Sequence, residues 1–327
     1  MASFGFLDVT IIPETREIFE NLSTKGELIF FAEENMSRLE NELPGLDIVF
    51  TRLYRIDCSF LQRAKNIKGI VVAGVGADHI DVECASKLGI PITISPGNEK
   101  STAEATVLLM LAVARQLPLK NKNTTSSANL LGKELFGKTL GLVGTGRVAK
   151  HVAHIAAHGL GMRVIATSPR VFEKKGKADW EPADMDKVIA ESDVVSLHCP
   201  LTPSTWHLFD ETRLRRMKKD AILINMARGG IIDEDALFRV LKEGHLMGAG
   251  LDVVKEEPLR EDNPLLQLEN VIVTPHRLTQ TTESLVNQAR AMCQSAIDLL
   301  QGRIPETTIN VDALPRDQKQ RTDDFSV

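Results

Sequence analysis

Several features that define particular classes of protein are missing from this chain of 327 residues. It contains no run of about 18 apolar residues, so the sequence predicts no membrane-spanning helix. The amino-terminal segment carries acidic side chains and no basic region before an apolar stretch, so we expect no signal peptide. The formal net charge of −5 gives no electrostatic attraction to nucleic acid or to an anionic membrane surface. These absences predict a cytoplasmic protein with no nucleic-acid and no membrane partner.

Closely spaced cysteines are also missing. The four cysteines are widely separated and form no CxxC pair: Cys58, Cys84, Cys199 and Cys293. In a cytoplasmic protein this pattern predicts reduced and mostly buried thiols. We also expect no metal site, and His198 in particular has no companion ligand at a suitable spacing.

What the chain does contain is an ordinary globular composition, with 43% hydrophobic and 25% charged residues. Apolar runs alternate with segments of helical period in two successive blocks. The runs of the first block are LDVTII, ELIFFA, IKGIVVAG and IPITISPG; those of the second are KTLGLVG, MRVIATS, DVVSLHC, AILINMA, MGAGLDV and VIVTP. Between the blocks, residues 101–117 predict one long, mostly buried helix. This alternation predicts an α/β protein with two doubly wound parallel-sheet domains and right-handed crossovers.

A glycine-rich loop opens the second block. In KTLGLVGTGRVAKHVA, Gly144, Gly146 and Ala149 occupy a G-x-G-x-x-(G/A) frame between a strand and a helix. Gly144 allows the tight turn, Gly146 lets the backbone approach a pyrophosphate, and Ala149 permits close helix–strand packing. The helix start at Arg147 and Val148 supplies amides and a positive dipole end. The pattern predicts dinucleotide binding; the alternative is a glycine turn that serves packing alone.

The next strand-like run, MRVIATS, lacks the acidic residue that usually holds the ribose hydroxyls of NAD. Ser168 stands in the expected place, and Arg170 follows two residues later. A carboxylate would repel a 2′-phosphate, whereas a hydroxyl and a guanidinium could bind one. We therefore expect NADP(H) to be preferred over NAD(H). The alternative is that Arg170 is a solvated surface residue and NAD binds less selectively.

Three polar residues follow the ends of successive apolar runs in the second block. Arg228 comes just after AILINMA, Glu257 lies beyond MGAGLDV, and His276 follows VIVTP. Because the carboxyl ends of parallel strands border the ligand crevice of a doubly wound sheet, the three side chains are predicted to converge there. Taken singly, Arg228 could bridge a surface carboxylate, Glu257 could belong to a solvated charged run, and His276 could be structural. Their joint position downstream of a dinucleotide loop favours a catalytic site.

The same segments resemble those of a known family. ADHIDVECASKLGIPITISPG, GKTLGLVGTGRVAK, SDVVSLHCPLTPSTWHLFD, ILINMARGGIIDEDALFRVLKEGHLMGAGLDVVKEEPL and VIVTPH resemble the D-isomer-specific 2-hydroxyacid dehydrogenases, and the likeness runs from about residue 45 to about residue 305. Members of that family reduce 2-keto acids to D-2-hydroxy acids with NADH or NADPH, or catalyse the reverse reaction. The matching motifs imply that Arg228 grips the substrate carboxylate and polarises the keto group, that His276 is the acid/base, and that Glu257 orients it.

These residue types suit that reaction. Hydride transfer to the keto carbon builds negative charge on the oxygen, and a protonated imidazole can donate its proton there. A neighbouring carboxylate fixes the ring and favours its charged form. Arginine can bind a carboxylate through two parallel hydrogen bonds, which lysine does less well.

The resemblance implies further contacts and partners. Additional cofactor contacts are expected at Thr106, His198, Pro200, Thr205, Ala227 and Asp252, and amides near Val75 and Gly76 would meet the substrate carboxylate. The latter pair could equally be a simple glycine turn. The family's domain plan places a smaller substrate domain at 1–100 and 295–327, with the larger cofactor domain inserted at 101–294. A small 2-keto or 2-hydroxy acid is the expected ligand, and a homodimer is the expected assembly.

Two segments depart from the family pattern. Arg277, Leu278 and Thr279 follow His276 where relatives carry small residues, which leaves the substrate side chain open. The polar stretch at 120–129, a predicted exposed loop, is shorter than the family's arm and lacks its tryptophan, which weakens the dimer inference.

A phosphite oxidase on the same scaffold and a nucleotide-sensing, corepressor-like binding protein remain alternatives. Glu257 argues against formate oxidation, since formate-oxidising relatives carry Gln there.

Overall fold

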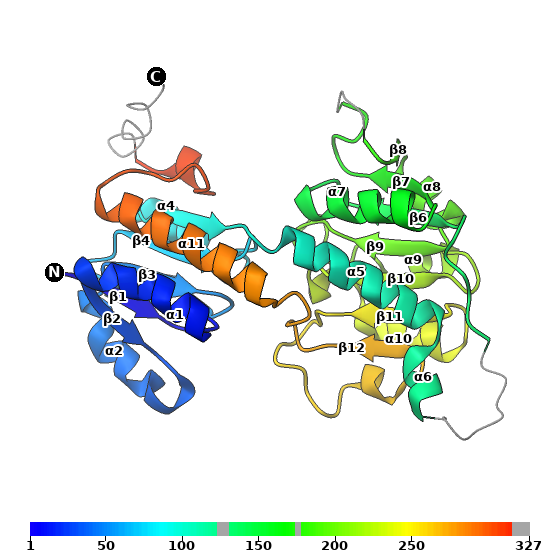
Figure 1. Cartoon of the computed structure of the whole chain (residues 1–327), viewed down its shortest axis with the longest axis horizontal. Helices are drawn as coiled ribbons and strands as arrows, with labels where there is room; N and C mark the ends of the chain where they lie inside the picture. The colour runs from blue at the N-terminus through cyan, green and yellow to red at the C-terminus, as the bar shows by residue number, and fades with distance from the viewer. Residues whose placement is uncertain (123–130, 174–177, 316–327) are drawn as a thin grey trace. The chain divides into compact units, whose positions relative to one another are not determined.

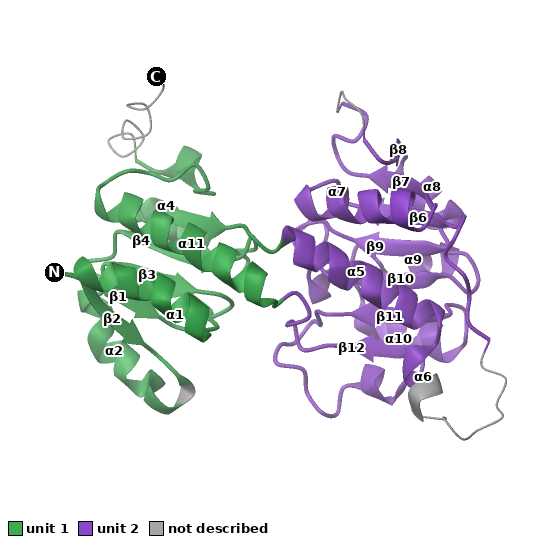
Figure 2. Ribbon diagram, viewed as in Figure 1, with its two compact units in different colours: residues 1–98, 280–327 green, residues 99–279 purple. Residues whose placement is uncertain are grey.

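The chain divides into two compact units, each described here by itself (Figure 2). The computed structural model describes residues 1–122, 131–173 and 178–315. Unit 1 comprises Met1–Asn98 and Gln280–Val327, and unit 2 comprises Glu99–Thr279. Most of the predicted loop at 120–129 lies outside the described residues, as does most of segment 312–327, whose polar composition predicts little order.

Unit 1 is built on a five-stranded parallel sheet (Figure 1). Its strands are β1 (Ala2–Phe6), β2 (Gly26–Phe30), β3 (Ile48–Thr51), β4 (Gly69–Ala73) and β5 (Ile92–Ser95). Its α-helices are α1 (Pro13–Glu20), α2 (Leu39–Glu42), α3 (Cys58–Arg63), α4 (Val82–Lys87) and α11 (Thr282–Leu300). The strand order β2-β1-β3-β4-β5 is the doubly wound order seen in flavodoxin-like folds.

Alternate residues of the unit 1 strands fill two separate apolar cores. On β4, Ile70 and Val72 belong to one cluster and Val71 to the other, because successive side chains of a strand point to opposite faces. The cluster with Val71 includes five residues of α11 (Ala289, Met292, Cys293, Ala296 and Leu299). The expected change of domain at 294/295 would divide this helix, all of which lies in unit 1.

The first predicted strand is wrong in position. We expected LDVTII, residues 7–12, to be a strand, whereas β1 ends at Phe6. The carboxylate of Asp8 accepts hydrogen bonds from the backbone amides of Arg52 and Leu53, each at 2.6 Å. These bonds draw the chain out of the sheet directly after β1, so the apolar residues that follow do not extend the strand.

Unit 2 is built on a seven-stranded parallel sheet (Figure 1). Its strands are β6 (Thr139–Val143), β7 (Arg163–Thr167), β8 (Glu181–Pro182), β9 (Val194–Leu197), β10 (Ile222–Asn225), β11 (Gly248–Leu251) and β12 (Val271–Val273). Its helices are α5 (Glu99–Ala114), α6 (Leu117–Lys122), α7 (Arg147–His154) with a π-helical continuation η4 (Ile155–Gly159), α8 (Met185–Glu191), α9 (Glu211–Arg216) and α10 (Glu234–Lys242). The strand order is β8-β7-β6-β9-β10-β11-β12. From β6 the chain adds strands first toward one edge of the sheet and then, starting with β9, toward the other. Doubly wound sheets bind ligands at such a switch point, which lies here between β6 and β9.

Helix α5 confirms a long buried helix at residues 101–117, but it ends at Ala114, since Gln116 has a left-handed φ of +51°. Ala103, Met110 and Ala114 have no exposed surface, and α5 packs together with α7 on one face of the sheet (Figure 1). A helix that is apolar on most sides is stable only when it is covered in this way. Among the described residues, no helix is long and apolar enough to cross a membrane.

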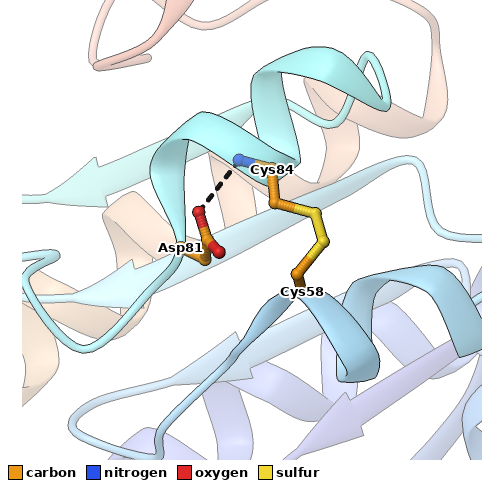
Figure 3. Close-up of side chains that lie close together, drawn as sticks. All are labelled: Cys58, Asp81 and Cys84. Carbon is orange, nitrogen blue, oxygen red and sulfur yellow. Dashed lines mark hydrogen bonds between the residues drawn. A yellow bond between two sulfur atoms is a disulfide. The ribbon is translucent and has the colours of Figure 1, made fainter.

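The expectation of four reduced cysteines is wrong for one pair. Cys58, the first residue of α3, forms a disulfide with Cys84 in α4 at a Cα–Cα distance of 5.5 Å (Figure 3). The two are 26 residues apart in the sequence, so their spacing showed no sign of proximity. The preceding residues bring them together, because Ile56 and Ile80 pair as an isolated parallel bridge. Asp81 caps α4 by accepting from the Cys84 amide at 2.9 Å.

The other two cysteines match the expectation of reduced thiols. Cys293 is buried and Cys199 is half-buried. Burial raises the pKa of the Cys199 thiol to about 11 and that of Cys293 to about 12. Neither is therefore an activated nucleophile at neutral pH.

Replacing both bonded cysteines, as Cys58→Ser with Cys84→Ser, should lower the free energy of unfolding by roughly 2–4 kcal/mol, because the unfolded chain regains the freedom of the closed loop. Urea unfolding of the variant, the parent and the reduced parent measures this, and the reduced parent should match the variant. In denaturant without reductant, the parent should show two reactive thiols. Four reactive thiols before reduction would contradict the pairing.

Candidate active site

The glycine loop has the geometry that a dinucleotide requires. Gly144 has a φ of +108°, and a Cβ on it would lie 2.5 Å from the backbone oxygen of His198, so only glycine fits the turn. Gly146 is the N-cap of α7, and no atom lies within 4 Å of where its Cβ would be. Ala149 is fully buried between helix and sheet. The loop therefore leaves open space at the start of α7 for a pyrophosphate, and the residues present fit this group.

The charges around this loop are few. The Arg147 guanidinium lies 3.7 Å from the carboxylate of Glu99, while Val148 is half-buried against the core. His198 follows β9, and its Nε2 lies 2.9 Å from the hydroxyl of Ser196. Burial lowers the pKa of His198 to about 4, so its imidazole is neutral at physiological pH. The backbone amides and the dipole of α7 therefore add to Arg147 as electropositive groups at the turn.

Ser168 directly follows β7, at the position where an acidic residue would hold the ribose hydroxyls of NAD. Its hydroxyl lies 2.9 Å from that of Thr145 in the glycine loop. Either hydroxyl can be the donor in this contact, and when Thr145 donates, Ser168 keeps its own proton for a ligand. Arg170 is exposed two residues later.

Two of the expected cofactor residues use their hydroxyls within the protein. Thr106 is fully buried in α5 and donates to the backbone oxygen of Thr102 at 2.7 Å. Thr205 donates to the backbone oxygen of Pro200 at 2.7 Å and so closes the loop after β9. Their roles as cofactor contacts stay predictions.

The turn that carries Arg228 is framed by a buried amide side chain. Asn225, the last residue of β10, accepts from the Ala227 amide at 3.0 Å and donates to the Arg228 oxygen at 2.9 Å. A Cβ on Gly229 would lie 1.9 Å from the carbonyl carbon of Val254, so glycine is required where these two backbones meet. Arg228 is half-buried, and its Nη1 donates to the Ala227 oxygen at 2.8 Å.

Glu257 and His276 form a close pair. The His276 Nδ1 lies 2.6 Å from Glu257 Oε2, and the two side chains are 17% and 27% exposed, respectively, with the histidine the less exposed. The other carboxylate oxygen, Oε1, accepts from the Val254 amide at 3.3 Å. Because Val254 also abuts the Arg228–Gly229 turn, one backbone segment links all three predicted catalytic residues. The structure thus brings them together at the carboxyl ends of β10, β11 and β12.

A buried carboxylate holds the turn on which His276 stands. Asp252 accepts from the Thr274 hydroxyl at 2.7 Å and from the amides of Arg277 and Leu278 at 3.1 Å each. His276 itself has a φ of +53°, a left-handed conformation that is uncommon for residues other than glycine. Burial raises the pKa of Asp252, while these hydrogen bonds oppose the shift. Asp252, expected only as a cofactor contact, holds the turn that carries the imidazole, and its role as a cofactor contact stays a prediction.

Some supporting residues were not foreseen from the sequence. Asn225 and Thr274 position the site through hydrogen bonds, and the only signal for Asn225 was a polar residue ending a buried strand. Trp206 is half-exposed, and its ring fills the space where a Cβ on Gly230 would lie, at 2.6 Å. Of the residues that depart from the family pattern, Arg277 is exposed and Leu278 packs against the core of unit 2.

The expected substrate loop lies in unit 1 and begins where β4 ends. Gly74, with a φ of +114°, exchanges backbone hydrogen bonds with Ser95. Val75 is exposed and Gly76 is half-buried. Their accessibility agrees with a binding role for the loop, which stays a prediction.

Comparisons with known proteins agree with this geometry. Residues 107–277 match the family model described as D-isomer specific 2-hydroxyacid dehydrogenase, NAD binding domain. A glyoxylate reductase from Aeropyrum pernix is 38% identical over 280 residues, which are 81% of this chain and 83% of that protein.

Two solved structures are similar over nearly their whole length. The crystal structure of TT0316 protein from Thermus thermophilus superposes with a TM-score of 0.83 at 34% identity, covering 94% of this chain and 100% of that one. An acyclic imino acid reductase in complex with NADPH and D-Arg has a TM-score of 0.82 at 27% identity, covering 94% and 99%. On its sequence, its two parallel sheets and its glycine loop, the chain belongs to the D-isomer-specific 2-hydroxyacid dehydrogenase family of oxidoreductases.

Proposed function

We propose that the protein reduces a small 2-keto acid to the D-2-hydroxy acid, with NADPH preferred over NADH. The observation that carries this proposal is the 2.6 Å contact between His276 and Glu257, beside the Arg228 turn and at the same sheet edge as the glycine loop. Keto-acid reduction with a nicotinamide cofactor is supported for the family in general by relatives such as the glyoxylate reductase.

Each of the three side chains has a separate role in the proposed reaction. When bound, the nicotinamide cofactor supplies the hydride that adds to the keto carbon. Glu257 holds Nδ1 of His276, so the proton that neutralises the developing alkoxide comes from Nε2. Arg228 binds the substrate carboxylate and stabilises negative charge on the keto oxygen. In the reverse direction Nε2 of His276 would take the proton of the substrate hydroxyl.

The cofactor preference rests on the residues after β7. Ser168 and Arg170 replace the acidic residue that would repel a 2′-phosphate, and the Ser168 hydroxyl can donate to that group when Thr145 is the donor in their mutual contact. The amides near Val75 and Gly76 are proposed to add hydrogen bonds to the substrate carboxylate. A cytoplasmic homodimer is part of the same proposal.

The proposal is tested by following NADPH and NADH oxidation in parallel over a panel of 2-keto acids, including glyoxylate and hydroxypyruvate. We expect kcat/KM to be higher with NADPH, and chiral chromatography should show the D product. Phosphite with NADP⁺ serves as the reverse control. Reduction of NADP⁺ by phosphite alone would favour the phosphite alternative. Tight NADPH binding without turnover of any keto acid would favour a nucleotide-sensing protein, and activity with NADH alone would overturn the cofactor preference.

Replacing the proposed acid/base, as His276→Ala, should lower kcat for keto-acid reduction by roughly 100- to 10,000-fold, the usual contribution of general acid catalysis. NADPH binding, measured by fluorescence titration, should survive, because the glycine loop is untouched. His151→Ala, on α7, is the matched histidine control and should retain full activity. Near-parental turnover in His276→Ala would remove His276 from the mechanism.

Arg228→Lys should chiefly weaken keto-acid binding, since an ammonium group cannot reproduce a bidentate contact with a carboxylate. Steady-state kinetics should show KM raised by about tenfold, equivalent to about 1.4 kcal/mol of binding. Arg216→Lys replaces an arginine that pairs with Asp186 on the surface, and it should leave KM unchanged. If Arg228→Lys altered neither KM nor kcat, Arg228 would not be the carboxylate-binding residue.

A further inference from the structure

Two histidines and an aspartate of unit 2 converge away from the residues described above. His154 ends α7, and His158 lies four residues later in the π-helical continuation η4. Their rings lie side by side, with centroids 4.7 Å apart. Asp179, which comes shortly before β8, places one carboxylate oxygen 3.0 Å from His154 Nδ1 and the other 3.0 Å from His158 Nε2. The three ligand-type atoms all lie within 4.8 Å of one another.

We propose that His154, His158 and Asp179 form a binding site for one divalent transition-metal ion of the Zn²⁺ or Ni²⁺ class. Imidazole nitrogen and carboxylate oxygen are common ligands of Zn²⁺, at about 2.0–2.2 Å from the metal. In a tetrahedral site these bond lengths put neighbouring ligand atoms about 3.3 Å apart. The two nitrogen–oxygen separations of 3.0 Å are already close to that value. The two separations involve different carboxylate oxygens, so the carboxylate must turn to present one oxygen to both nitrogens while the two rings approach each other. Water would then occupy the fourth position.

The surroundings of Asp179 hold its carboxylate in this place. Trp180, the next residue, packs against the core that α5 and α7 share. Glu181, the first residue of β8, pairs with Arg163 at 2.7 Å, and Arg163 also binds Glu191 at 2.9 Å. Trp180 and Glu181, the two residues after Asp179, are therefore both held in place. This limits the conformational entropy that the Asp179 segment would lose when an ion binds.

His154 and His158 share one face because residues four apart in a helix lie on the same side. His158 lies in η4, where the helical repeat differs from that of α7. Such turns are rare and occur often at functional sites. Exposed ion pairs contribute little to the stability of a fold. The contacts of Asp179 with the two histidines therefore do not by themselves account for the convergence of the three side chains. An ion would tie the end of α7 to the connection between β7 and β8, at the opposite end of the helix from Gly146.

This site was not foreseen from the sequence. Two histidines four residues apart on an exposed helix face predict solvated polar residues, and the third ligand comes from a separate segment. The expectation of no metal site was drawn from spacing, which does not show that Asp179 lies across the pair.

Metal binding tests the proposal directly, without reference to catalysis. The untagged protein is stripped with EDTA, dialysed, and titrated calorimetrically with Zn²⁺ and with Ni²⁺, with Mg²⁺ as the negative control because it prefers oxygen ligands. We expect one saturable equivalent of Zn²⁺ or Ni²⁺ and none of Mg²⁺. Zn²⁺ should also raise the Tm, since an ion that binds only the folded state stabilises it.

The variants decide whether these residues hold the ion. His154→Ala, His158→Ala and Asp179→Asn should each weaken binding by about tenfold or more and abolish the Zn²⁺-dependent rise in Tm. His151→Ala, one turn earlier on the same helix, should bind as the parent does. Absence of saturable binding in the parent, or parent-like binding in the His154→Ala/His158→Ala double variant, would overturn the proposal.

Discussion

The buried carboxylate of Asp252 determines where the imidazole of His276 lies. Three donors converge on its Oδ1, one from Thr274 before the histidine and two from the residues after it. A left-handed backbone at a residue other than glycine costs on the order of 1–3 kcal/mol, and these hydrogen bonds offset that cost. Glu257 then has only to fix the rotation of the ring. Asp252 and Glu257, both of unit 2, therefore hold the turn and the ring before any ligand binds.

Much of unit 2 could be predicted because its determinants are local or periodic. The glycine frame at 144–146 specifies a turn and an open helix start wherever a buried strand precedes it. Arg228, Glu257 and His276 could be grouped because parallel strands bring their carboxyl ends to one edge of a sheet, and the structure places all three there. The long helix at 101–117 was recognisable because it is apolar on most sides, which fits only a covered position.

The features that the sequence did not reveal depend on contacts between distant segments. Apolar character alone could not show that β1 lies at Ala2–Phe6 rather than in LDVTII, since the carboxylate of Asp8 decides where the strand ends. The bond between Cys58 and Cys84 depends on the pairing of Ile56 with Ile80. Asp179 lies across two histidines that precede it by more than 20 residues. Cofactor contacts such as Thr106 remain predictions, because they concern a ligand rather than the fold.

The position of α11 affects the order in which the polypeptide can fold during synthesis. Proteins emerge from the ribosome amino-terminus first, and domains generally fold as units. The apolar face of β4 in unit 1 is covered by Met292, Ala296 and Leu299, which are translated only after the whole of unit 2. Unit 2 is contiguous and can fold as soon as it has emerged. Phe19 of α1 can already pack against Phe6, but the side of β4 that carries Val71 stays without its α11 cover, and so exposed to water, until translation of unit 2 is complete.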